Sequence, residues 1–341
     1  MKLLTFVIPA YNSEKFLDKC ITSLLAAEVL EKLEIIVIND GSTDGTVQIA
    51  ENYCTNYPDV VRLISQENKG HGGALNTGCV AAQGKYLKVI DADDWVETQN
   101  LSIFIRHLEN CDSEVVLTHY HTIDISNGEI KNWRNYPDEF EKRYSFADVM
   151  SSWKSFDRSL TFHGITYRTD FYQKYAKPLP EHVFYEDHEY ATFPCCMAES
   201  ITCFDLFIYD YRIGDVNQSV SNQNQLKRIA HTDLVIRRMI DRYCQLPESD
   251  GKRYAAMKTQ GLILSYLTTV LLVNPNRAEG QKQAKTIMEH CQRNALEIYN
   301  LALRKYQVFH MMNRLHIGKD TWDAILNSRI YKRVYQKHDF K

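Results

Sequence analysis

Short apolar runs alternate with helix-like segments in the N-terminal part of the chain. Four of these runs have the length and composition of buried strands. They cover residues 3–8, 34–38, 60–64 and 86–90. After each of the first three, apolar residues recur with the spacing of a helix. This alternation predicts an α/β fold with a mostly parallel sheet and right-handed crossovers.

A polar turn follows each of the four runs. The turns are residues 9–13, 39–45, 66–73 and 91–94. The carboxyl ends of parallel strands share one edge of a sheet, and ligands bind at that edge in open α/β folds. We therefore expect the four turns to converge on one crevice, whereas each turn alone is ordinary turn chemistry.

The fourth turn carries the carboxylates of Asp91, Asp93 and Asp94 within four residues. Three acids at a strand end repel one another unless a positive charge lies among them. A hard divalent cation, Mg²⁺ or Mn²⁺, is the natural partner for such oxygens and commonly accompanies a phosphate-bearing ligand. The alternative interpretation is a solvated acidic turn that caps the next helix.

A second group of candidate residues follows in the middle of the chain. His119 and His121 would share one face of a strand at 114–122, and the sequence favours a polar sheet face over a metal pair because no third ligand lies nearby. After a strand at 162–167, the acidic stretch 184–190 opens a helical segment. Either the helix dipole simply stabilises these acids at the start of the helix, or one of them is a general base held over the crevice.

Arg212 ends an aromatic, strand-like run and precedes a polar loop at 215–225. Two interpretations of this residue stay open. It is either a surface cation or a partner for phosphate oxygens in charge-assisted hydrogen bonds. In the second case the loop would close on a bound nucleotide and exclude water.

From about residue 226 the pattern changes to long helical periodicity. The sequence therefore predicts two domains, 1–222 and 226–341, the second serving acceptor binding, oligomerisation or membrane contact. Its 13-residue apolar stretch, 261–273, is shorter than a bilayer span, so we expect a buried helix. In the tail at 327–341, basic and apolar residues interleave, as in a helix lying on an anionic membrane surface or one packed on the protein.

Composition adds limits to this picture. The 341 residues are 44% hydrophobic and 24% charged, with a net charge of −3, which is ordinary for a soluble globular protein and gives no field that would attract nucleic acid. Nine cysteines without a CxxC pair indicate reduced thiols and a cytoplasmic location, which includes the inner face of the cell membrane. The apolar run at the N-terminus is too short for a signal peptide.

Five blocks of the sequence resemble the signature of family 2 glycosyltransferases, in order and at typical spacing. The blocks are residues 7–12, 38–46, 68–70, 91–94 and 186–187. Tyr211 and Arg212, together with residues 218–221, are similar to the donor-side loop of bacterial members of that family. The resemblance covers residues 3–222, and it does not specify which sugar is transferred.

The resemblance implies a GT-A fold and an inverting transfer from a UDP-sugar to a hydroxyl of a glycan, lipid-linked or protein-linked acceptor. Asp187 would be the base, and Asp93 with Asp91 would bind Mn²⁺ or Mg²⁺ at the diphosphate. Pro9, Tyr11 and Asp40 would hold the uracil and ribose. The full donor set implied is Pro9, Tyr11, Asp40, Asn68, Gly70, Asp91, Asp94 and Arg212, of which Asp94 would contact the donor sugar.

The sequence departs from the family pattern at His71, where many relatives carry an apolar residue, and beside Asn76, where many carry an arginine. His163 and His188 are the candidates for a third metal ligand. Two other functions are alternatives to sugar transfer. A nucleotidyltransferase would need a loop rich in glycine, arginine and lysine after the first strand, and an inactive sugar-nucleotide binding module would be expected to have lost an acid.

Overall fold

The computed structural model describes residues 2–215 and 222–327. Within these ranges the chain forms two compact units. The first contains residues 2–215 and 248–254, and the second contains residues 222–247 and 255–327. The chain therefore returns to the first unit after leaving it. The single boundary predicted between residues 222 and 226 does not account for this return.

The first unit is built on a ten-stranded sheet with the order β3-β2-β1-β4-β9-β6-β10-β5, to which β7 adds beside β6 and β8 beside β10. The strands are β1 (Leu4–Ala10), β2 (Leu33–Asp40), β3 (Val61–Gln66), β4 (Tyr86–Val89), β5 (Trp95–Val96), β6 (Val115–Asp124), β7 (Ile130–Trp133), β8 (Arg143–Tyr144), β9 (Ile165–Arg168) and β10 (Ile201–Ile213). The predicted α/β class is confirmed.

The pairing of the strands differs between the two halves of this sheet. In the first half, β3, β2, β1 and β4 are all parallel, as the alternating pattern predicts. In the second half, β9 runs antiparallel to β4 and β6, while β10 is parallel to β6. The sheet as a whole is mixed because β9 follows a long connection that contains β7, β8 and the short α5, and not a single crossover helix.

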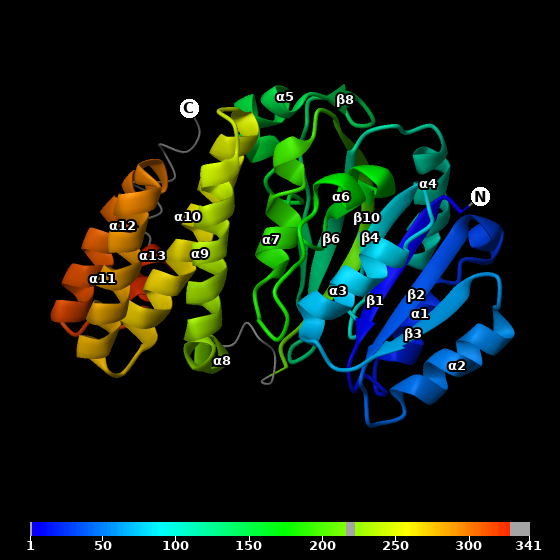
Figure 1. Cartoon of the computed structure of the whole chain (residues 1–341), viewed down its shortest axis with the longest axis horizontal. Coiled ribbons are helices and arrows are strands. Elements are labelled where there is room, and N and C mark those ends of the chain that lie inside the picture. The colour runs from blue at the N-terminus through cyan, green and yellow to red at the C-terminus, as the bar shows by residue number, and fades with distance from the viewer. Residues whose placement is uncertain (1, 216–221, 328–341) are drawn as a thin grey trace. The chain divides into compact units, whose positions relative to one another are not determined.

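Helices cover both faces of the parallel half. They are α1 (Leu17–Leu24), α2 (Thr46–Asn56), α3 (Gly70–Ala81) and α4 (Thr98–Glu109). The first unit also contains the shorter α5 (Phe146–Ser151), α6 (Thr169–Tyr175) and α7 (Asp187–Thr192). All seven residues of β1 are buried. Figure 1 shows α3 crossing one face of the sheet. The close approach needs Gly78, because a Cβ there would lie 2.3 Å from Val7 Cγ1.

The second unit is helical, as the periodicity predicts. It contains α8 (Asn222–Lys227), α9 (Ile229–Gln245), the rest of α10 (Asp250–Thr268) with a π-helical turn (Thr269–Val273), α11 (Arg277–Asn294), α12 (Leu296–Arg314) and α13 (Lys319–Asn327). The continuous helix Asp250–Val273 is long and apolar enough to cross a membrane. However, 56% of its apolar window is buried, and the core helix of a soluble protein passes the same test.

The segment 248–254 completes the core of the first unit. The Tyr254 side chain is fully buried, its ring lies 5.5 Å from that of Phe146, and its hydroxyl donates a hydrogen bond of 3.0 Å to the carbonyl of Ala191. The tail at 328–341 and the loop at 216–221 lie outside the described residues. The expected membrane contact of the tail and the expected closure of the loop therefore stay predictions.

Candidate active site

The first three polar turns bond to one another at the carboxyl edge of the sheet. The turns after β1 and β2 are joined because the Asn12 amide donates to Ser42 Oγ (3.0 Å) and the Thr43 amide donates to Asn12 Oδ1 (2.8 Å). The Gly45 amide donates to Glu14 Oε2 at 2.9 Å. We call residues 9–14, 39–46 and 66–70 the turn network.

Asp40 is the centre of the turn network. Its side chain is buried, and its Oδ1 accepts hydrogen bonds from Gln66 Nε2 (2.7 Å) and from the Lys69 amide (2.9 Å). The Asn68 side chain donates to the Asp40 carbonyl at 2.9 Å. The fold thus brings the two candidate residues Asp40 and Asn68 together, and their hydrogen bonds hold the backbone of the third turn.

Pro9 and Tyr11 lie at the end of β1 with opposite exposures. Pro9 is buried within the strand. The Tyr11 side chain, just beyond the strand, is 54% exposed, so one face of its ring is available to a planar ligand. Their expected contacts with uracil and ribose stay predictions.

Gly70 begins α3 with a φ of +74°, a conformation that favours glycine. A Cβ at this position would also lie 2.9 Å from the backbone of His182. The His182 amide donates to the carbonyl of Lys69 at 2.8 Å. The glycine-rich turn is therefore packed against the segment that leads into α7.

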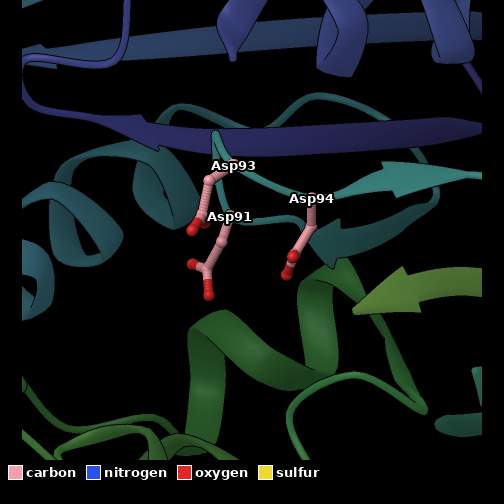
Figure 2. A group of neighbouring side chains, drawn as sticks. All are labelled: Asp91, Asp93 and Asp94. Carbon is pink, nitrogen blue, oxygen red and sulfur yellow. The ribbon is translucent and has the colours of Figure 1, made fainter. Parts of the chain in front are cut away.

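The predicted acidic turn brings three carboxylates together. One oxygen each of Asp91, Asp93 and Asp94 lies within 4.8 Å of the other two. Figure 2 shows the three side chains projecting to the same side of the turn. With Glu186, Asp187 and Arg212, these three acids form what we call the acidic cluster.

Asp94 is the most enclosed member of the cluster. The residue is 1% exposed, its Oδ2 accepts a hydrogen bond of 2.5 Å from the Tyr209 hydroxyl, and its Oδ1 accepts one of 2.8 Å from the Arg212 amide. Burial, followed by the charges of Asp91 and Asp93, raises the pKa of Asp94 well above its usual value. In this arrangement Asp94 fastens the acidic turn to β10, and its expected contact with a donor sugar stays a prediction.

Asp93 is more accessible, with 38% of its side chain exposed. Burial and the neighbouring Asp91 carboxylate raise the pKa of Asp93 to about 6. Arg212 opposes this rise, since its Nη1 lies 3.6 Å from Asp93 Oδ2. The Arg212 side chain is only 11% exposed, its Nη2 lies 3.1 Å from Asp215 Oδ2, and its guanidinium covers the Phe16 ring at 4.5 Å. The interpretation of Arg212 as a surface cation is therefore wrong.

In this cluster, Asp187 is the first residue of α7 and Glu186 directly precedes it. Asp187 is partly exposed, and within residues 2–215 and 222–327 its side chain makes no hydrogen bond or ion pair. Its charge acts on His163, Glu186 and Tyr211. Glu186 is 2% exposed. Asp187 thus offers a free carboxylate at the edge of the cluster, while Glu186 is held inside it.

His71 is a site residue whose role the sequence did not reveal. Its Nδ1 lies 2.6 Å from Glu186 Oε1, and its Nε2 lies 2.9 Å from Asp91 Oδ1. Burial opposes the charge on the ring, but the two carboxylates raise the pKa of His71 well above its usual value. The only signal was a polar residue where an apolar one is usual, and that signal gave no partner.

Lys88 and His163 contact each other, and the charges of Asp91 and Asp187 in the acidic cluster act on His163. Lys88 is fully buried in β4, and its Nζ donates to the carbonyls of His163 (2.7 Å) and Ile165 (3.1 Å). Burial lowers the pKa of Lys88 to about 7. The His163 ring stacks on Tyr211 with 4.2 Å between centroids, and burial lowers its pKa to about 4.

His119 and His121 do not form a metal pair in this arrangement. His119 Nε2 lies 3.1 Å from Asp205, whereas His121 Nδ1 lies 2.8 Å from Asp210. Each ring is engaged with a different acid, which agrees with the polar sheet face favoured by the sequence.

The acidic cluster fits a hard divalent cation. Asp91 uses one oxygen for His71 and retains the other, and Asp93 is accessible. Both oxygens of Asp94 already accept hydrogen bonds. Carboxylate oxygens are the ligands that Mg²⁺ and Mn²⁺ prefer, so Asp91 and Asp93 would hold the ion.

Comparison with known proteins gives one family. A family model described as glycosyl transferase family 2 matches residues 5–175. Among curated proteins, the chain is 33% identical over 128 residues to the glycosyltransferase GlyG of Streptococcus pneumoniae, a match that covers 37% of this chain and 42% of GlyG. It is 32% identical over 155 residues to a chondroitin synthase of Escherichia coli, covering 45% of this chain and 22% of the synthase. The matched segment thus spans less than half the length of these relatives.

Solved structures share the fold over almost the whole chain. The crystal structure of S. aureus TarS in complex with UDP-GlcNAc has a TM-score of 0.60 at 18% identity, with 93% of both chains covered. A Pyrobaculum calidifontis mannosyltransferase in complex with GDP-Man and Mn²⁺ has a TM-score of 0.51 at 16% identity, covering 98% of this chain and 87% of that one. At these identities the likeness concerns the fold.

Proposed function

The chain belongs to glycosyl transferase family 2, and on that premise we propose that it is an inverting glycosyltransferase that moves a sugar from a UDP-sugar to an acceptor hydroxyl. The observation that carries this proposal is that Asp187 directly follows Glu186, which His71 joins to Asp91 of the acidic turn. In the same turn, Asp93 lies 3.6 Å from Arg212. The turn network contains an exposed aromatic ring, Tyr11, that could stack on a nucleotide base.

The reaction is a direct displacement. The acceptor oxygen forms a bond to the anomeric carbon, the bond from that carbon to the phosphate oxygen breaks, and UDP leaves with the electron pair. The acceptor proton passes to the Asp187 carboxylate as the new bond forms. A single base suffices because attack from the face opposite the phosphate needs no covalent intermediate.

Arg212 acts on the leaving side. Negative charge grows on the diphosphate as the bond breaks, and a guanidinium stabilises that charge through parallel hydrogen bonds. The side chain is enclosed by Phe16 and close to Asp93, so it is already oriented before a ligand binds. A divalent ion held by Asp91 and Asp93 would supply further charge compensation for the diphosphate.

The acceptor and the cellular location are also proposals. The acceptor is a hydroxyl of a glycan or of a lipid-linked or protein-linked sugar. The name of the related chondroitin synthase, which refers to a glycan, supports this class of acceptor. The helical unit would bind this acceptor or a second copy of the chain. None of the nine cysteines, all within the described residues, is in a disulfide, which supports a location in the reducing cytoplasm, at the inner face of the membrane.

The proposal is tested by screening UDP-sugars with Mn²⁺ for sugar transfer or slow hydrolysis, using the wild type and Asp187→Asn. We expect one donor to stand out and the variant to lose rate by about 100-fold or more, with UDP affinity almost unchanged. The matched control is Asp59→Asn, which alters an exposed carboxylate outside the site. A variant with nearly wild-type rate would move the base elsewhere, and no turnover with any nucleotide sugar would overturn the proposed function.

A further inference from the structure

His71 links two parts of the site that are far apart in the sequence. It is the second residue of α3, 20 positions from Asp91 and 115 from Glu186, and it contacts both carboxylates at 2.9 and 2.6 Å. The Glu186 side chain is 3% exposed, whereas the Asp91 side chain is 29% exposed. One ring thus joins a buried acid beside the base to a partly open acid on the metal side.

The two contacts use the two ring nitrogens separately. Nδ1 lies within hydrogen-bond distance of Glu186 and Nε2 within hydrogen-bond distance of Asp91, so one ring can serve both carboxyl groups at once. An amide side chain could serve one of these carboxylates but not both. The imidazole ring is therefore suited to this position by its geometry, because its two nitrogens point away from each other.

Helix α3, which carries His71, is hydrogen-bonded to the segment that leads into α7. In α3, the Asn76 side chain pairs with the backbone of Leu179 through two hydrogen bonds of 2.9 Å, one to its amide and one to its carbonyl. A Cβ at Gly72 would lie 2.5 Å from the carbonyl of Pro180, so the helix and the following segment are in direct contact. His71 therefore lies on a helix that packs directly against residues 179–180, in the segment that leads into α7.

On the acceptor side, the contact between His71 and Glu186 holds the residue that directly precedes α7. Glu186 precedes the base directly, and its carbonyl accepts hydrogen bonds from the amides of Glu189 (2.8 Å) and Tyr190 (3.2 Å). Tyr185, one residue earlier, has a φ of +72°, a conformation that a non-glycine residue adopts only when its surroundings enforce it. Holding the Glu186 side chain therefore restrains the turn that presents Asp187.

On the donor side, the contact orients Asp91. With Oδ1 bound to His71, the carboxylate has one oxygen left to face Asp93. Hydrogen-bonded partners of this kind orient metal-ligating carboxylates, and their loss typically costs 10- to 100-fold in metal affinity or activity.

We propose that His71 is a positioning residue that sets both sides of the site, orienting Asp91 for the cation and donor through Nε2 and fixing the Glu186–Asp187 turn for the acceptor through Nδ1. This proposal rests on the proposed function. It assigns no proton transfer to His71, since Asp187 remains the base.

Three substitutions separate the two contacts. The amide of His71→Asn reaches the position of Nδ1, so this variant retains the Glu186 contact alone. The longer amide of His71→Gln reaches the position of Nε2 and retains the Asp91 contact alone. His71→Leu retains neither. The control is His107→Leu, which removes a similar pair (3.3 Å to Glu141) outside the site from a side chain of similar exposure.

Two readouts are needed, UDP affinity in Mn²⁺ by calorimetry and kcat at saturating donor. We expect His71→Leu to lose at least tenfold in each. His71→Gln should retain UDP affinity within about threefold and lose kcat, and His71→Asn should show the reverse split. Thermal unfolding of all variants identifies any that fail to fold, and a merely structural role would lower the melting temperature without splitting the two readouts.

The outcomes are distinguishable. If the wild type transfers sugar and His71→Leu matches the control, the positioning role is overturned and the proposed function stands. If His71→Leu binds Mn²⁺ and UDP more tightly, the ring acts as a charge that competes with the cation, which also overturns the proposal. A wild type that transfers from no donor overturns both.

Discussion

The turn network and the acidic cluster lie at the same sheet edge but are stabilised in different ways. In the turn network, charged side chains such as Asp40 and Glu14 accept hydrogen bonds from backbone amides, so the chain itself satisfies them. In the acidic cluster, five carboxylates gather beside Arg212 and His71, and burial together with the neighbouring carboxylates raises the pKa values of Asp93 and Asp94. The first region is complete without a ligand, and the second is left with excess negative charge that a cation would balance.

Among the changes predicted here, a substitution of Arg212 in the acidic cluster should have the largest effect. Arg212→Lys retains one charge but loses the planar pair of donors, and lysine cannot copy a two-bond contact with phosphate. We expect kcat to fall by about 10- to 1000-fold while UDP-sugar affinity falls less, because the charge develops in the transition state. Steady-state kinetics measure both values, and an unchanged kcat would remove the diphosphate role.

Removing the divalent ion should come next in size. In EDTA we expect UDP affinity to fall by about 100-fold, since the acids then repel the diphosphate. Asp93→Asn should weaken the dependence on Mn²⁺, whereas a change in the turn network should leave it intact. Calorimetric titration of UDP with and without Mn²⁺ gives the comparison, and equal affinities would contradict the metal role of Asp93.

A change in the turn network should have a smaller and different effect. Asp40→Ala leaves the Lys69 amide and the Gln66 side chain without their acceptor, which should cost about 1–3 kcal/mol of unfolding free energy. UDP affinity should fall about tenfold, with the same fold-change in Mn²⁺ and in EDTA. Urea unfolding and calorimetry test this, and a loss of metal dependence would show that the two regions are not separate.

The last prediction concerns stability alone and involves the buried Lys88. Burial lowers the pKa of Lys88 in the folded chain from 10.5 to about 7. Between these values the unfolded chain binds a proton that the folded chain does not, so this residue makes stability rise with pH. The slope is at most about 1.4 kcal/mol per pH unit. Relative to Lys88→Met, the wild type should gain stability from pH 7 to 9 in urea unfolding, and parallel curves would contradict the assigned pKa.

How much of this could be predicted from sequence depended on the range of the interactions. Strands β2, which ends at Asp40, and β4, which ends two residues before Asp91, were predictable because a run of apolar residues and a polar turn are local signals. The order of the sheet after β4 was not, since β9 joins it through a long irregular connection whose pairing no local pattern specifies. The parallel half was therefore predicted better than the mixed half.

The site residues divide in the same way. Residues that bring a characteristic charge to a turn, such as Asp93 and Asp187, could be proposed from the family resemblance. The bridge made by His71 could not, because its partners approach only in the folded chain. Lys88 was counted as part of an apolar strand, and nothing in its neighbours indicated that its amine would bind two carbonyls of a distant segment.

The return of residues 248–254 to the first unit has a consequence for how the protein is made. Tyr254 fills a position in the core between α5 and α7, and its hydroxyl satisfies the carbonyl of Ala191. As the chain emerges from the ribosome, the sheet and its turns are synthesised first, but the place of Tyr254 stays empty until much of the helical unit has also been made. A ribosome that pauses within α9 would therefore expose an incomplete catalytic core, and the first unit reaches its native packing only once residue 254 has left the exit tunnel.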